Sequence, residues 1–177
     1  MSLNTRFGSD VRIGGGIDTG RSVSDNCFVV DSPQLLYCRT VTAFKDQTQV
    51  KLYGSYPLPG GFGVSAILNN LVGALVLANY TVTRAQIEGL GRPLSTSSRS
   101  VQLVEPNTRF EPRRTTIDVQ LKNTLQLGRY QFKPTLGLYN ALNTSAPVAF
   151  NGTYGPRWFP TGITEGRLVQ VAAELSF

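Results

Sequence analysis

Apolar and polar residues alternate with a period of two along much of this chain. The pattern is clearest in the last stretch, where every second residue is apolar: Val169, Val171, Ala173, Leu175 and Phe177. Successive side chains of a strand point to opposite faces, so the pattern predicts a strand with one apolar and one mostly polar face. An aromatic last residue on such a strand is typical of outer-membrane β-barrels. The last strand of a soluble sheet is the alternative.

Five earlier stretches alternate in the same way, at residues 11–18, 49–56, 62–69, 117–122 and 130–139. The third continues less regularly to Leu77. Short turns are expected at Pro57–Gly61 and Leu127–Arg129. Long irregular connections are expected over 21–44, 79–113 and 140–162, with a possible short strand at Val101–Val104.

The chain is therefore predicted to be an all-β, antiparallel up-and-down meander of about six long strands in one domain, 1–177. Short and long connections alternate, as they do in transmembrane β-barrels, although a soluble meander also allows this order. No apolar stretch approaches the ~20 residues of a membrane helix, so insertion in a membrane would be by strands. Six strands are too few for a bacterial barrel, whose smallest form has about eight. Either the long connections hide strands, or the chain is part of a larger barrel.

Composition narrows the possible chemistry. Charged residues make up only 16% of the chain, below the roughly 25% that is usual for soluble proteins. The net charge is +6, but basic residues are scattered and only Arg113 and Arg114 are adjacent, so nucleic acid is not an expected partner. Histidine is absent, which excludes Ser-His-Asp and Cys-His catalysis and histidine-based metal sites. We expect no enzyme activity, no cofactor and no metal.

Two features bear on the cellular compartment. Cys27 and Cys38 share a loop-like stretch and are predicted to form a disulfide in an oxidising compartment; two unpaired buried thiols are the alternative. The first residues lack the apolar segment of a secretory signal. A chain that otherwise looks exported is then expected to be a fragment or a truncated reading frame.

Several motifs, in this order, resemble the C-terminal part of one family. They are Gly54-Ser55-Tyr56-Pro57-Leu58-Pro59, Arg114 with Ile117-Asp118-Val119, Leu138-Tyr139-Asn140-Ala141-Leu142-Asn143, Tyr154-Gly155-Pro156-Arg157-Trp158, Gly166-Arg167-Leu168 and Phe177. Asp25-Asn26-Cys27 after the first strand adds to the likeness. The family is the TonB-dependent outer-membrane receptors that carry an N-terminal carboxypeptidase-regulatory-like domain, frequent in acidobacteria.

This resemblance implies the last strands of a barrel of about 22 strands in a bacterial outer membrane, and a role in energy-coupled uptake of a scarce ligand. The implied partners are outer-membrane lipid, the remaining barrel strands and plug, the barrel-assembly machinery, and a periplasmic coupling protein that acts through N-terminal parts. No plug or coupling box is present in the sequence. The C-terminal insertion signal would comprise Val171, Ala173, Leu175 and Phe177, although Leu175 and Ala172 stand where the family prefers an aromatic residue and glycine.

Two groups of residues are candidates for ligand contact. The first group falls on the faces assigned to the barrel lumen: Asp18, Arg114, Asp118, Lys122, Lys133, Tyr139 and Glu174. These side chains either meet a ligand or plug, or simply hydrate and salt-bridge a polar interior. The second group, Tyr154, Trp158 and Phe159, is either a stacking surface in an external loop or loop packing. A soluble, secreted β-sandwich or barrel that binds glycans through these aromatic loops is the alternative function.

Overall fold

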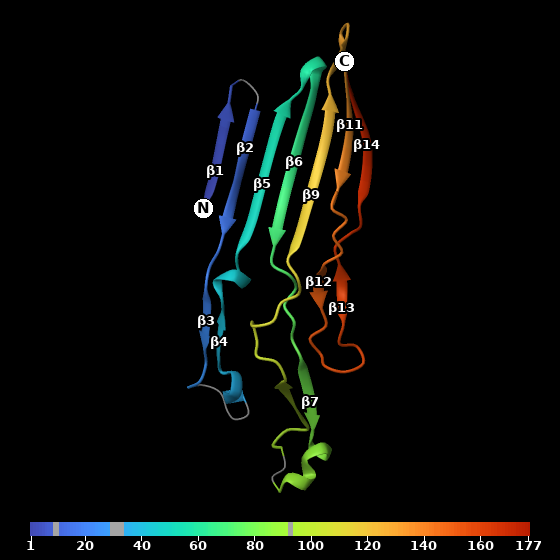
Figure 1. The fold of residues 1–177 in the computed structure, drawn as a ribbon. Coiled ribbons are helices and arrows are strands. Elements are labelled where there is room, and N and C mark those ends of the chain that lie inside the picture. Colours follow the sequence, from blue (N-terminus) through green and yellow to red (C-terminus); the bar gives the residue numbers. More distant parts are fainter. Residues whose placement is uncertain (9–10, 29–33, 92–93) are drawn as a thin grey trace.

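The computed structural model describes residues 1–8, 11–28, 34–91 and 94–177, and strands make up most of its regular structure (Figure 1). The strands are β1 (Ser2–Phe7), β2 (Val11–Asp18), β3 (Ser22–Asp25), β4 (Arg39–Thr42), β5 (Gln49–Pro57), β6 (Phe62–Leu71), β7 (Asn79–Thr83), β8 (Ser98–Gln102), β9 (Arg114–Asn123), β10 (Leu125–Leu127), β11 (Tyr130–Tyr139), β12 (Pro147–Phe150), β13 (Pro160–Ile163) and β14 (Leu168–Ser176). Short 3₁₀ helices are η1 (Gln34–Tyr37), η2 (Phe44–Asp46), η3 (Pro59–Gly61) and η4 (Arg84–Leu90). Within these residues, no helix has the length and apolar character needed to cross a membrane.

One antiparallel sheet contains all the long strands. Its order is β1-β2-β5-β6-β9-β11-β14, and β10 continues β9 beside the same neighbour, β11. The predicted up-and-down meander is confirmed, but it has seven strands rather than about six. The additional strand is β1, where Leu3 and Phe7 lie on one face with Thr5 between them, and Ser2, Asn4 and Arg6 lie on the other. The sheet is not closed into a barrel.

The connections alternate in length, as the sequence predicted. Tight turns join the long strands at one end of the sheet, here called the turn end, where the C-terminus also lies (Figure 1). The three long connections leave the opposite end, here called the hairpin end. They were expected to be irregular, but each contains a two-stranded hairpin: β3–β4, β7–β8 and β12–β13. β8 overlaps the short strand expected at Val101–Val104.

The regular strand β6 ends at Leu71, short of the Leu77 that the sequence predicted, and beyond it only an isolated antiparallel bridge joins Leu75 to Phe110. Just beyond it, Gly73 lies directly against the backbone of Glu111 and Pro112, so closely that a Cβ atom would collide with their carbonyl groups. Here the chain leaves the ladder of the sheet.

A proline lies inside β11, although this strand has neighbours on both sides. Proline cannot donate a ladder hydrogen bond and is normally confined to edge strands or bulges. Pro134 pairs with Ala173 of β14, and on its other side the neighbouring strand is interrupted between Asn123 and Leu125. The break between β9 and β10 thus provides the irregularity that accommodates this proline.

The strand registers place the apolar positions of all seven strands on one face. One row of paired residues crosses the sheet through Ile13, Gly54, Ala66, Val119, Leu138 and Val169. The apolar face, as we call it, also carries Leu3, Phe7, Val11, Ile17, Val50, Leu52, Tyr56, Phe62, Val64, Leu68, Ile117, Leu121, Phe132, Leu136, Val171, Ala173 and Leu175. The opposite, polar face carries most of the charged and amide side chains of these strands.

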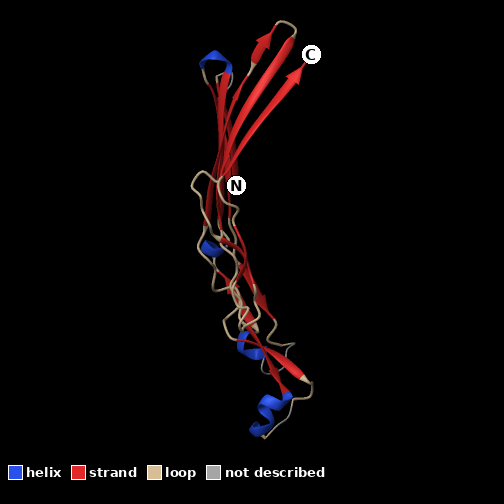
Figure 2. Ribbon diagram, turned by 90° about the vertical axis from the view of Figure 1, so that its right-hand side faces the viewer, coloured by secondary structure: helices blue, strands red, loops and turns tan. Residues whose placement is uncertain are grey.

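No second layer packs on the apolar face within the described part of the chain, and the sheet is thin when seen edge-on (Figure 2). Leu121, Leu136 and Val171 keep 37%, 47% and 80% of their surface exposed. Among the described residues, the buried hydrophobic side chains are only Ala78 and Ala146, both outside the sheet. The strands therefore hold together through their ladders, without a hydrophobic core beneath them.

Candidate functional site

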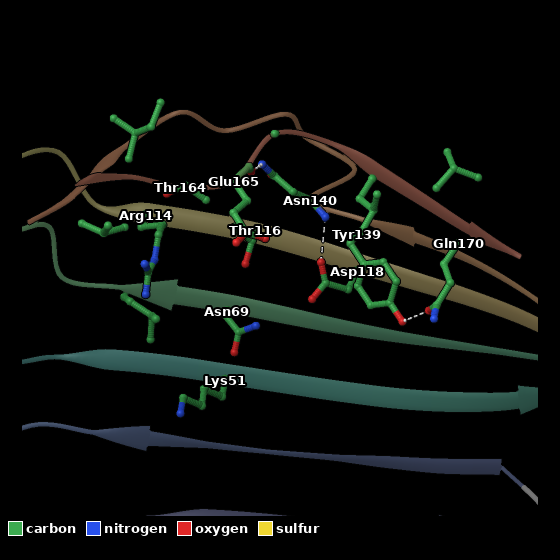
Figure 3. A pocket seen from close by; sticks show the side chains of 16 residues that line it. Lys51, Asn69, Arg114, Thr116, Asp118, Tyr139, Asn140, Thr164, Glu165 and Gln170 are labelled. Carbon is green, nitrogen blue, oxygen red and sulfur yellow. Dashed lines mark hydrogen bonds between the residues drawn. The ribbon is translucent and has the colours of Figure 1, made fainter. Parts of the chain in front are cut away.

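A hollow of about 870 Å³ lies on the polar face at the hairpin end. Strands β5, β6, β9, β11 and β14 form its floor, and the connection between β11 and β14 forms one rim (Figure 3). Its charged residues are Lys51, Arg114, Asp118 and Glu165, two of each sign. Amide and hydroxyl side chains lie among them, so the hollow is a hydrogen-bonding surface with balanced charge.

Asn140 holds the rim of this hollow in place. It is only 6% exposed and has a φ of 47°, the left-handed conformation that asparagine tolerates best after glycine. Its backbone N–H donates to the Asp118 carboxylate at 2.8 Å (Figure 3). Its side-chain amide donates to the carbonyls of Thr144 and Glu165 at 2.9 and 2.8 Å and accepts from the Thr144 N–H at 3.0 Å. One residue thus links β9, β11 and the segment before β14.

Two tyrosines lie flat over glycines on the polar face. The Tyr139 ring covers Gly137 and its hydroxyl donates to Gln170 at 2.8 Å, across to β14. Tyr53 covers Gly14 of the next strand and hydrogen-bonds Asn4 of β1, so it spans three strands. Both glycines are buried. Tyr53 thus supplies a cross-strand contact that Gly14 cannot make itself, whereas Tyr139 covers a glycine of its own strand and reaches β14 through its hydroxyl.

The structure places every predicted lumen residue on the polar face, but it does not bring them into one cluster. Asp118, Arg114 and Tyr139 line the hollow; Asp18 lies at the hairpin end of β2 and Lys122 toward the turn end. Lys133 and Glu174 face each other on β11 and β14 and form an ion pair of 3.1 Å. Arg114 and Asp118 were expected to share a network, yet no ion pair joins them. Asp118 accepts from the Asn140 backbone instead.

The aromatic loop residues are used largely in packing. The Trp158 ring contacts Phe150 and Tyr154 at centroid distances of 5.6 and 5.5 Å. Its indole N–H donates to the Leu77 carbonyl at 2.7 Å, and Tyr154 N–H donates to the Asn79 carbonyl at 2.9 Å. This cluster fastens the third long connection to the second. Phe159 lies beside it with half of its surface exposed.

The structure also shows where the predicted disulfide and the expected C-terminal insertion signal lie. Cys27 and Cys38 form a disulfide, as predicted, which joins the segment after β3 to the residue before β4 and so lies at the end of this hairpin. Val171, Ala173 and Leu175 of the expected insertion signal lie on the apolar face, and Phe177 follows them almost fully exposed.

Arg113 has a position that the sequence analysis did not identify. Its guanidinium donates to the Asn70 side chain at 2.7 Å, to the Thr48 carbonyl at 2.6 Å and to the Lys45 carbonyl at 3.2 Å. Asn70 in turn donates to Thr115 at 2.6 Å. These polar groups close the apolar face at its hairpin end. The only sequence signal was the pair Arg113-Arg114. It does not reveal that Arg113 binds neighbouring carbonyl groups while Arg114 lines the hollow.

No family model, no curated protein and no solved structure matches this chain. Among the described residues, no three His, Cys, Asp or Glu side chains lie close enough together to hold a metal ion. The arrangement of the residues themselves is therefore the basis of the functional proposal.

Proposed function

We propose that this chain forms part of the wall of a transmembrane β-barrel in a bacterial outer membrane. The observation that carries the proposal is the register of the sheet. Seven strands place their apolar alternate residues on one continuous face, and the described part of the chain provides nothing to cover it. The outer surface of such a barrel alternates with a polar interior along every strand.

The dimensions of the sheet support this proposal. β6, β9 and β11 contain 10 residues each, and β5 and β14 contain 9. A tilted strand needs roughly 9–11 residues to cross the hydrocarbon layer. Short turns on one side and long hairpins on the other are also the asymmetry of barrels in this membrane.

Aromatic side chains at the turn end give further support. Phe7, Tyr56, Phe62 and Phe132 lie near the turn-end tips of their strands on the apolar face, and Phe177 follows β14 at the same end. Aromatic rings are favoured at the boundary between lipid and water, where they form girdles around membrane barrels. The turn end would then lie at the periplasmic boundary and the three hairpins outside the cell.

Within this proposal, the resemblance to TonB-dependent receptors gives the more specific function. The wall would belong to a receptor for energy-coupled uptake, and the hollow at the hairpin end would face the entering ligand or the plug. Coupling would act through other parts of the receptor. The glycan-binding alternative has less support, because the rings of Tyr154 and Trp158 pack against each other and the Trp158 indole is bound to the Leu77 carbonyl of the second connection.

Fluorescence quenching by brominated lipid tests the proposal. Leu68 and Ile67 are adjacent aliphatic residues of β6 that lie on opposite faces. In a Trp158→Phe background, Leu68→Trp is expected to be strongly quenched when the protein is reconstituted in vesicles of dibrominated phosphatidylcholine. Ile67→Trp on the polar face is the matched control and should be quenched weakly. Equal quenching at both positions, or none at residue 68, would refute lipid contact.

A further inference from the structure

The main sheet has two edges that carry no neighbouring strand in the described part of the chain. β1 pairs only with β2, and β14 pairs only with β11 over its whole length of 9 residues. Met1 exchanges hydrogen bonds with Ile17 at 2.9 Å in both directions. Because bonded and non-bonded pairs alternate along an antiparallel ladder, the backbone groups of Ser2 and Asn4 point away from β2.

Open edges are tolerable in water but not in hydrocarbon. Each unsatisfied backbone group in lipid costs several kcal/mol, so membrane strands are paired on both sides. If the apolar face meets lipid, as proposed above, both β1 and β14 require a neighbour.

The direction of the two edge strands restricts what that neighbour is. Consecutive strands of the meander alternate in direction, so in a sheet of seven the first and last run the same way. Figure 1 shows β1 running toward the turn end, and the C-terminus after β14 lies at that end as well. Direct pairing of β1 with β14 would be parallel, whereas bacterial outer-membrane barrels are antiparallel and even-numbered.

A second copy of the chain meets the same difficulty. Head-to-tail copies would again pair β1 with β14 in parallel. Copies related by a two-fold axis would pair β1 with β1 or β14 with β14 in antiparallel fashion, but one copy would then be inverted. Its long hairpins, with their disulfide and polar loops, would lie on the side of the short turns.

We propose that the sheet is completed by an odd number of strands from outside residues 1–177, and that the strands next to β1 and β14 both run from the turn end to the hairpin end. These strands present apolar side chains on the same face as their neighbours here. The total is then even and every pair is antiparallel. The inference rests on the proposed membrane location. It adds that the missing strands are odd in number and gives the direction of the two that adjoin β1 and β14.

Site-specific photo-crosslinking in the cell that produces the protein tests this assignment. Benzoylphenylalanine replaces Val169 or Leu175 on β14, and Leu3 or Phe7 on β1, one position at a time. Val119 in the central β9 is the control, because its expected contacts, Ala66 and Leu138, are fixed by the register. Mixed isotope labelling separates contacts within one chain from contacts between copies, and mass spectrometry identifies the crosslinked peptides.

The expected products from both edges join residues outside 1–177. The segment reached from residue 175 must come earlier in its own sequence than the segment reached from residue 169, which is the antiparallel order. Crosslinks between β1 and β14, between two copies, or in the parallel order would overturn the proposal. So would the absence of edge products while residue 119 crosslinks normally. If lipid quenching succeeds and this order fails, only the present inference is lost; if quenching fails, the membrane proposal is lost first.

Discussion

Asn140 connects three segments around the hollow, and its substitution should therefore destabilise the whole hairpin end. Asn140→Ala removes three side-chain hydrogen bonds, each worth about 0.5–1.5 kcal/mol, and strains a left-handed residue by about 1 kcal/mol. We expect a loss of about 3 kcal/mol in the free energy of unfolding, measured by guanidinium titration in detergent with circular dichroism.

Two variants serve as controls for this prediction. Asn143 also has a positive φ, but its side chain accepts one bond, from Arg167 N–H at 3.1 Å, and is exposed. Asn143→Ala should therefore cost clearly less than Asn140→Ala. Asn140→Gly keeps the left-handed conformation accessible and isolates the side-chain bonds. Equal losses for the two alanine variants would contradict the role given to Asn140.

The contact between Tyr53 and Gly14 leads to a second prediction. A Cβ atom on Gly14 would lie 2.6 Å from the Tyr53 ring, so Gly14→Ala must displace the ring and break its hydrogen bond to Asn4. Overpacking of this kind costs about 1–3 kcal/mol. Gly54→Ala is the matched control in the next strand, because its Cβ would meet the Arg12 carbonyl at an ordinary 3.5 Å. Thermal unfolding should separate the two; equal melting temperatures would contradict the contact.

At the scale of single residues, the sequence could predict placement but not partners. Alternation correctly assigned Asp118 and Tyr139 to the polar face, because the side-chain period of a strand fixes the face. It could not predict that Asp118 binds the backbone of Asn140, since every residue carries such an N–H group. Arg113 escaped prediction for the same reason. Two of its acceptors, the carbonyls of Lys45 and Thr48, leave no mark in the sequence.

At the scale of elements, the long strands were predictable and the hairpins were not. The six expected strands correspond to β2, β5, β6, β9, β11 and β14. In each of them apolar and polar residues alternate over most of the strand, and this period of two is visible in the sequence. β1 has only 6 residues, with just Leu3 and Phe7 apolar on one face, and was not predicted as a strand. The strands of the hairpins contain 4 or 5 residues. Their stability comes from cross-strand pairing, which local periodicity does not report.

The β3–β4 hairpin should depend on its disulfide while the main sheet does not. β3 and β4 pair only with each other among the described strands, and Cys27 and Cys38 close a separation of 11 residues. A bond of this span stabilises by roughly 3 kcal/mol in the chain-entropy description. In a Cys27→Ser/Cys38→Ser variant we expect proteolysis and amide exchange to increase in β3 and β4. Exchange in β5 and β6 is the internal control, and its acceleration would contradict an independent hairpin.

At the scale of the whole molecule, the sequence left two alternatives open: further strands inside the long connections, or a chain that is part of a larger barrel. Six alternating strands were too few for a bacterial barrel, whose smallest form has about eight. The sequence could not give the seventh strand, and therefore could not give the parity of the edges. Whether the two edge strands run in the same or in opposite directions depends on the total number of strands, which is known only from the complete strand order.

If the apolar face meets lipid, as proposed, stability should vary with depth along the strands. On β9, polar Thr115 and Asn123 delimit the apolar positions Ile117, Val119 and Leu121, with Val119 midway. An arginine on the lipid side costs about 2–4 kcal/mol at the bilayer midplane and about 0–1 kcal/mol near the interfaces. Arginine is therefore substituted at each position along this face, and the loss in the free energy of unfolding is measured in phospholipid vesicles. This loss should be largest at residue 119 and smaller at 117 and 121.

Gln120→Arg is the control for that profile, because residue 120 is next to Val119 but lies on the polar face. Its arginine would extend from the polar face into water and should change the free energy of unfolding by less than about 0.5 kcal/mol. A protein partner that covers the apolar face would produce a different profile, because close packing penalises arginine at 117, 119 and 121 by similar amounts. A flat profile would therefore reject lipid as the surrounding medium, whereas a peak at the middle of the strand requires a layer with two polar boundaries.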